Sequence, residues 1–96
     1  MPDQVETVTV TIQSEADDVD EVTIPAGLVE LLAEDEQSPA ETIGDVVLLS
    51  FASRAHHVVH HEGPEGEDFG PEEAEIMELF EERFGVTYAE ATGHHH

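Results

Sequence analysis

The chain has 96 residues, and its 24 Asp and Glu stand against two Arg and no Lys, which gives a formal net charge of −22. Nucleic-acid binding is disfavoured, because affinity for phosphates comes largely from Lys and Arg. The chain also has no cysteine, which excludes a disulfide framework, a thiolate metal site and a cysteine nucleophile.

The excess of carboxylates predicts a particular solvent environment. Like charges crowded on a small surface oppose compaction, and molar salt shortens the screening length to about 3 Å. Leu, Ile, Val and Phe still supply about a quarter of the residues, which is enough for a packed core. No apolar run approaches the roughly 20 residues of a membrane span. We therefore expect a folded protein of a high-salt cytoplasm, away from membranes.

The N-terminal segment predicts a β-hairpin. Residues 4–13 alternate between Thr and aliphatic side chains, and Val22 and Ile24 repeat the alternation up to Pro25. An acidic loop over residues 15–20 separates the two strands. We expect an antiparallel pair whose apolar side chains pack against the long central helix; these are Val8, Val10, Ile12, Val22 and Ile24.

Two helices are expected next. Pro25 opens a short helix with Leu28, Leu31 and Leu32 on one stripe. A stronger signal follows at Ser38-Pro39-Ala40-Glu41, which offers an N-cap Ser, a Pro at the first helical position and a Glu at the third. This signal predicts a long helix over residues 39–61.

The long helix contains a candidate interface. Four consecutive apolar residues, Val46, Val47, Leu48 and Leu49, cover every side of the helix, because each residue advances by 100°. A helix that is apolar all round must be buried all round, and a chain of this length has few elements to surround it. A second copy is the natural cover, so we expect a homodimer. The second half of the helix is amphipathic, with Phe51, Ala55, Val58 and Val59 expected to face inward.

The C-terminal third predicts one further helix. Residues 62–70 are rich in Gly and acidic side chains and read as a flexible loop. A helix is expected over residues 71–84, with Gly85 as its C-cap and residues 86–92 as one more helical turn. Its buried stripe comprises Ile76, Met77, Phe80 and Phe84. Residues 93–96 form a disordered tail that is either native or an expression-tag remnant, and this tail carries no functional weight.

These elements together predict a small α+β protein. The order is β-β-α-α-α in a single domain over residues 1–96, built around the long central helix.

Four histidines on the long helix form the chemically distinct surface. His56, His57, His60 and His61 make two overlapping i, i+4 pairs within one arc, and such a pair can hold a divalent transition metal. A zinc site needs a third ligand, for which Glu62, Glu65 or a partner's His are the candidates. The alternative is that these side chains are polar helix-end residues that relieve repulsion and gain charge on mild acidification.

Catalysis is not expected. Carboxylate pairs occur throughout so acidic a chain, and the sequence has no Lys or Cys nucleophile, phosphate-binding loop or Gly-x-Ser-x-Gly turn. Three functions remain open. The first is a non-catalytic accessory or protein-interaction domain, the second a metal-binding or pH-responsive histidine face, and the third a transcription regulator.

The regulator hypothesis rests on a local resemblance. Residues 22–51 comprise a strand ending Val22-Thr23-Ile24-Pro25, a Leu-rich helix and a second helix. This order resembles the strand-helix-helix order of ribbon-helix-helix repressors. The resemblance implies a dimer whose paired strands read DNA. Here the corresponding positions carry Asp20 and Glu21, and no cation that binds phosphate.

A second resemblance spans the whole chain. The chain is similar to small uncharacterised acidic proteins of halophilic archaea in three features. It has no Lys, it has an acidic hairpin loop, and its Glu-rich terminal helix closes in Phe84-Gly85-Val86-Thr87-Tyr88. This resemblance implies a salt-rich habitat and assigns no site.

Overall fold

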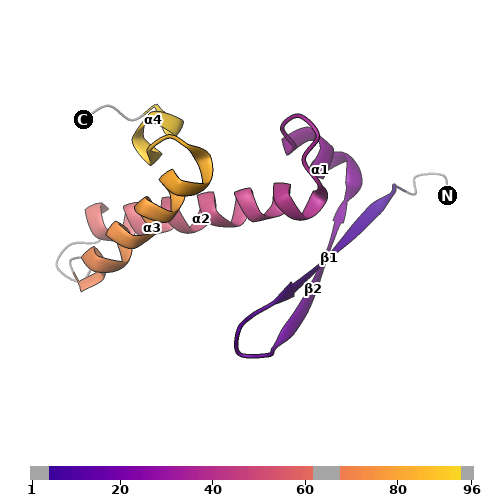
Figure 1. Cartoon of the computed structure of the whole chain (residues 1–96), viewed down its shortest axis with the longest axis horizontal. Coiled ribbons are helices and arrows are strands. Elements are labelled where there is room, and N and C mark those ends of the chain that lie inside the picture. The colour runs from indigo at the N-terminus through magenta and orange to yellow at the C-terminus, as the bar shows by residue number, and fades with distance from the viewer. Residues whose placement is uncertain (1–4, 62–67, 94–96) are drawn as a thin grey trace. The chain divides into compact units, whose positions relative to one another are not determined.

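The computed structural model describes residues 5–61 and 68–93 (Figure 1). It is an α+β protein with an N-terminal antiparallel hairpin followed by helices, as the sequence predicts. The chain divides into two compact units, Met1–Asp45 and Val46–His96, and α2 (Pro39–His61) contributes residues to both. The single domain over residues 1–96 stays a prediction.

The first unit is built on the hairpin. Strands β1 (Thr7–Gln13) and β2 (Val19–Pro25) pair antiparallel, with Thr7 opposite Pro25 and Gln13 opposite Val19. The turn between them is tighter than expected, because Asp17 adopts a left-handed conformation (φ 68°), which Asp tolerates better than most residues. The backbone N–H of Ser14 then donates to the Asp18 carbonyl at 3.1 Å, so β2 begins already at Val19.

The hairpin is covered by the short helix and not by the long one. Helix α1 (Ala26–Leu32) contacts both strands and buries Val29, whereas Val8, Val10 and Ile24 are half-buried. Ile12 and Val22 are exposed, which corrects the expectation that the whole apolar set of the hairpin packs on the long helix. The physical reason is the length of α1, which at seven residues covers only part of the strands.

Helix α2 begins as its capping signal predicts. The Ser38 hydroxyl accepts a hydrogen bond from the Glu41 N–H at 3.1 Å, and the Glu41 carboxylate accepts one from the Ser38 N–H at 2.9 Å. Buried Thr42 donates from its hydroxyl to the Ser38 carbonyl at 3.1 Å. These bonds satisfy donors that the first helical turn would otherwise leave unpaired.

The second unit consists of the remainder of α2, α3 (Gly70–Phe84) and α4 (Tyr88–Thr92). Helix α3 ends at Gly85 in the left-handed conformation (φ 76°), which confirms the predicted C-cap. The buried hydrophobic residues of the second unit are Phe80 of α3 and Ala52 of α2. Phe51, expected inward, is instead 64% exposed. The expected loop is described only at residues 68–70, where a helical turn leads into α3; its other residues, like 94–96 of the tail, lie outside the described ranges.

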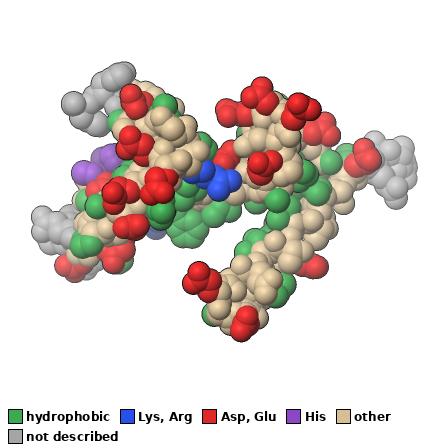
Figure 2. All heavy atoms as spheres, viewed as in Figure 1, with side chains coloured by type: hydrophobic (Ala, Val, Ile, Leu, Met, Phe, Trp, Pro, Cys, Tyr) green, Lys and Arg blue, Asp and Glu red, His purple; other side chains and the backbone are tan. Residues whose placement is uncertain are grey.

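Much apolar surface stays accessible in both units. Val29, Ala52 and Phe80 are the buried hydrophobic residues of the described part of the chain. Figure 2 shows apolar side chains on the visible surface of the hairpin and the helices, interspersed with carboxylates. A chain with this distribution has more apolar side chains than its own fold covers.

Candidate metal centre

The structure divides the four predicted histidines of α2 into two pairs. The rings of His56 and His60 lie 4.6 Å apart between centroids, and those of His57 and His61 lie 5.2 Å apart and stacked. Both distances follow from i, i+4 spacing, which places side chains one above the other on a helix. The pairs differ in surroundings, because only His56 and His60 meet a side chain of α3 in the described residues.

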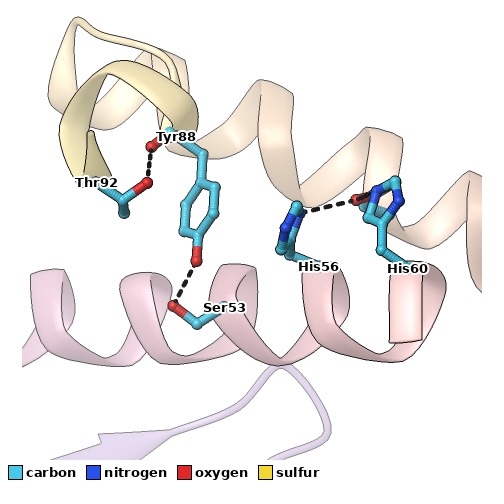
Figure 3. Close-up of polar contacts among 6 residues, drawn as sticks. Ser53, His56, His60, Tyr88 and Thr92 are labelled. Carbon is cyan, nitrogen blue, oxygen red and sulfur yellow. Dashed lines mark hydrogen bonds and ion pairs between the residues drawn. The ribbon is translucent and has the colours of Figure 1, made fainter. Parts of the chain in front are cut away.

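That side chain is Glu73, in the first turn of α3. Its Oε2 lies 2.9 Å from His60 Nε2 and 3.7 Å from His56 Nδ1, and dashed lines mark these contacts of the two labelled histidines in Figure 3. One ligand atom from each of the three residues falls within 4.8 Å of the other two. The structure therefore brings together two imidazoles and one carboxylate from two helices.

The placement of Glu73 is unusual for this chain. Among the described Asp and Glu residues, only Asp45 and Glu73 are not exposed. Asp45 accepts a hydrogen bond from the Gln37 side-chain amide at 2.7 Å. The Glu73 side chain is only 19% exposed and faces both imidazoles. A partly desolvated carboxylate needs a cationic or hydrogen-bonding partner, and the histidines supply it.

The spacing of the three groups suits a small divalent cation. Zinc binds imidazole nitrogen and carboxylate oxygen at about 2.0–2.2 Å, so two ligands of a tetrahedral ion lie about 3.3 Å apart. The 2.9 and 3.7 Å contacts of the Glu73 carboxylate lie on either side of that value. All three ligand atoms lie within 4.8 Å of one another, so the groups must move closer together to bond one ion.

An aromatic residue of α4 borders the site. The ring of Tyr88 lies 5.6 Å from that of His56 between centroids, and its hydroxyl donates to the Ser53 hydroxyl at 3.0 Å (Figure 3). Helix α4 is itself fixed by a capping box between Thr87 and Glu90. The Tyr88 ring therefore limits the rotation of His56, the less exposed of the two candidate ligands.

Sequence reasoning missed Glu73, although a signal was present. Glu73 precedes Ile76, Met77 and Phe80 by three, four and seven residues, so it occupies the buried stripe of α3. A carboxylate on the buried face of a helix indicates a partner, because Asp and Glu are seldom buried unpaired. The third ligands proposed from the sequence, Glu62 and Glu65, lie outside the described residues.

The remaining predicted site residues are not part of this cluster. His57 and His61 are exposed on the neighbouring arc of α2. Within the predicted interface, Val46, Val47 and Leu49 are exposed and Leu48 is half-buried. Their role as an interface stays a prediction.

The fold and the cluster define an acidic α+β protein with two histidines and one carboxylate gathered between helices. The chain belongs, over residues 1–96, to a family of unknown function (DUF7545). No curated protein and no solved structure matches it. Within residues 5–61 and 68–93, no helix has both the length and the apolar character needed to cross a bilayer.

Proposed function

We propose that this chain is a non-catalytic module that binds a divalent transition metal through His56, His60 and Glu73. The observation that supports the proposal is the position of Glu73, a mostly covered carboxylate in a chain whose other carboxylates, Asp45 excepted, are exposed in the described residues. A carboxylate needed only for solubility would point to solvent. This one faces two imidazoles.

The ligand set indicates the class of metal. Imidazole nitrogen suits zinc, copper and nickel, whereas magnesium and calcium prefer oxygen ligands throughout. Two histidines and one carboxylate supply three ligands, and water completes a tetrahedral site. Because the ligands come from α2 and α3, the metal joins these helices and stabilises the second unit by mass action.

Protons compete for the same site. Imidazole must be neutral to bind a metal, so affinity falls on acidification. Without metal, a protonated His60 forms a charge-assisted hydrogen bond with Glu73 in the geometry observed. The module then exchanges metal for protons as pH falls, which unites the metal-binding and pH-responsive hypotheses.

The acidic surface supports a salt-rich cytoplasm as the working environment, in keeping with the resemblance to halophilic proteins. Figure 2 shows groups of carboxylates scattered over the visible face, and concentrated salt screens their repulsion. The ribbon-helix-helix hypothesis receives less support, because β2 pairs along its length with β1 of the same chain. In a ribbon-helix-helix dimer, that strand pairs with its symmetry mate.

The test is calorimetric titration of zinc into a chain that ends at Gly93, in 2 M KCl at pH 7.5. Ending there removes His94–His96, which bind metals by themselves. We expect one zinc per chain, and at least tenfold weaker binding after Glu73→Gln, because one of three ligands loses its charge. His56→Gln with His60→Gln should abolish binding.

The second histidine pair provides the matched control. His57→Gln with His61→Gln removes an i, i+4 pair of the same helix without touching Glu73, and zinc affinity should stay within about twofold. Equal losses from both pairs, or unchanged affinity in Glu73→Gln, would show adventitious binding to helix histidines and refute the proposal.

A further inference from the structure

Helices α2 and α3 also carry an apolar groove, on the side away from the histidines. One hollow of about 420 Å³ is lined by Phe51, Arg54, Ala55, Val58, Phe69 and Glu72. A second, of about 300 Å³, shares Phe51, Ala55 and Glu72 and extends to Glu75, Ile76 and Leu79. At 100° per residue, the α2 residues of the groove centre on the helix face roughly opposite His56 and His60.

The groove exposes aromatic and aliphatic side chains that a monomer normally covers. Phe51 is 64% exposed, Phe69 51% and Leu79 42%. Ala55 provides a shallow floor between them, which leaves room for a side chain from outside. A concave apolar surface of this kind on a soluble protein marks an association site.

The charges at the groove indicate its occupant. Arg54, one of only two basic residues of the chain, lines the same hollow as Glu72. No ion pair of the Arg54 guanidinium occurs within residues 5–61 and 68–93, despite the abundance of carboxylates. The groove thus carries one cation on α2, which has no ion pair among the described residues, and two carboxylates, Glu72 and Glu75, on α3.

This pattern is self-complementary. In a twofold dimer, residue i of one copy contacts residue j of the other, and j contacts i. A twofold axis through the groove sets Arg54 against Glu72 of the partner subunit, and the reverse, while the apolar side chains meet at the centre. Two cation-carboxylate pairs form from one patch, without any second protein.

We propose that this groove is the interface of a homodimer, in which α2 and α3 of two copies pack face to face and Arg54 pairs with the partner's Glu72. This interface does not involve the metal site. It lies one to three turns beyond residues 46–49, on a face of α2 and α3 together. Salt strengthens the dimer, because the repulsion between two chains of charge −22 is screened while the apolar contact persists.

Sedimentation equilibrium tests the proposal, in 2 M KCl with a chelator, so that metal bridging between copies cannot contribute. We expect twice the 10.5 kDa of the chain, and weaker association in 0.2 M KCl. Phe51→Ser should yield monomer. Because Phe51 is largely exposed, this substitution leaves the fold of the monomer intact, which circular dichroism verifies.

Charge exchange identifies the pairing. Arg54→Glu and Glu72→Arg should each raise the dissociation constant about tenfold, since each places like charges in direct contact inside the interface, where salt screens them much less than on the open surface. The double variant should restore the dissociation constant. Val47→Ser and Leu31→Ser, at exposed positions outside the groove, should leave the dimer unchanged. A monomer at every concentration overturns the proposal. So does dissociation by Val47→Ser but not by Phe51→Ser, or a double variant no better than the singles.

Discussion

Phe80 is the side chain on which the second unit most depends. It is 2% exposed, and its ring contacts Phe84 at 4.4 Å and Tyr88 at 5.6 Å between centroids, the latter edge to face. Complete burial of a Phe side chain stabilises a fold by about 1.5–3 kcal/mol, and each aromatic pair adds about 0.5–1.5 kcal/mol. Phe80→Ala should therefore cost about 3–5 kcal/mol, the usual range for a buried Phe.

The assay is urea unfolding in 2 M KCl, followed by circular dichroism. Phe80→Leu should lose less, about 1–2 kcal/mol, because it keeps most of the buried volume and loses the ring contacts. Leu31→Ala, at an exposed position of α1, should change stability by less than about 0.5 kcal/mol. A loss below 1 kcal/mol for Phe80→Ala would refute the view that α3 and α4 are anchored by this ring.

Two further predictions concern the capping box of α4. First, Thr87→Ala should lower the stability of the fold by about 1 kcal/mol. It should also increase hydrogen exchange at the Glu90 amide, which donates to the Thr87 hydroxyl at 3.1 Å. Thr92→Ala on the same helix should have little effect on that amide. Second, the pKa of Glu90 is lowered from its ordinary 4.5, because its carboxylate accepts hydrogen bonds from the Thr87 backbone N–H and, to a lesser degree, the Thr87 hydroxyl. A lowered pKa means that the capping contribution is complete above about pH 4.5 and is lost as pH falls through the pKa of the folded state. Carboxyl titration by NMR should give a midpoint below 4.5 in the wild type, and Thr87→Ala, which removes the hydroxyl and keeps the backbone N–H, should raise it. A wild-type midpoint at or above 4.5 would contradict the assignment.

Local signals in the sequence predicted the elements well. The capping box at Ser38 and Glu41 fixed the start of α2, and Gly85 fixed the end of α3, because both depend on residues within one helical turn. The start of β2 was missed because the left-handed conformation of Asp17 shortens the turn. Nothing in the composition of an acidic loop distinguishes a six-residue connection from a tighter one.

Contacts between elements were harder to predict. Helix α2 has apolar residues on more than one face, and the sequence does not show which face α3 covers. The structure buries Ala52 and exposes Phe51, the reverse of the order that hydrophobicity alone suggests. For the same reason the contact between Glu73 and His60 was not predicted. The two residues are thirteen positions apart, and their approach depends on how α3 packs on α2.

The hairpin consists of two strands, so each of them is an edge of the sheet. An edge strand leaves backbone donors and acceptors open to further strands, and Ile12, Val19 and Val22 expose β-branched side chains along it. Asp20 and Glu21 lie within β2, where their charge repels an approaching copy. The acidic composition therefore guards against strand-by-strand aggregation, and the protein loses that protection in acid, where the carboxylates become neutral.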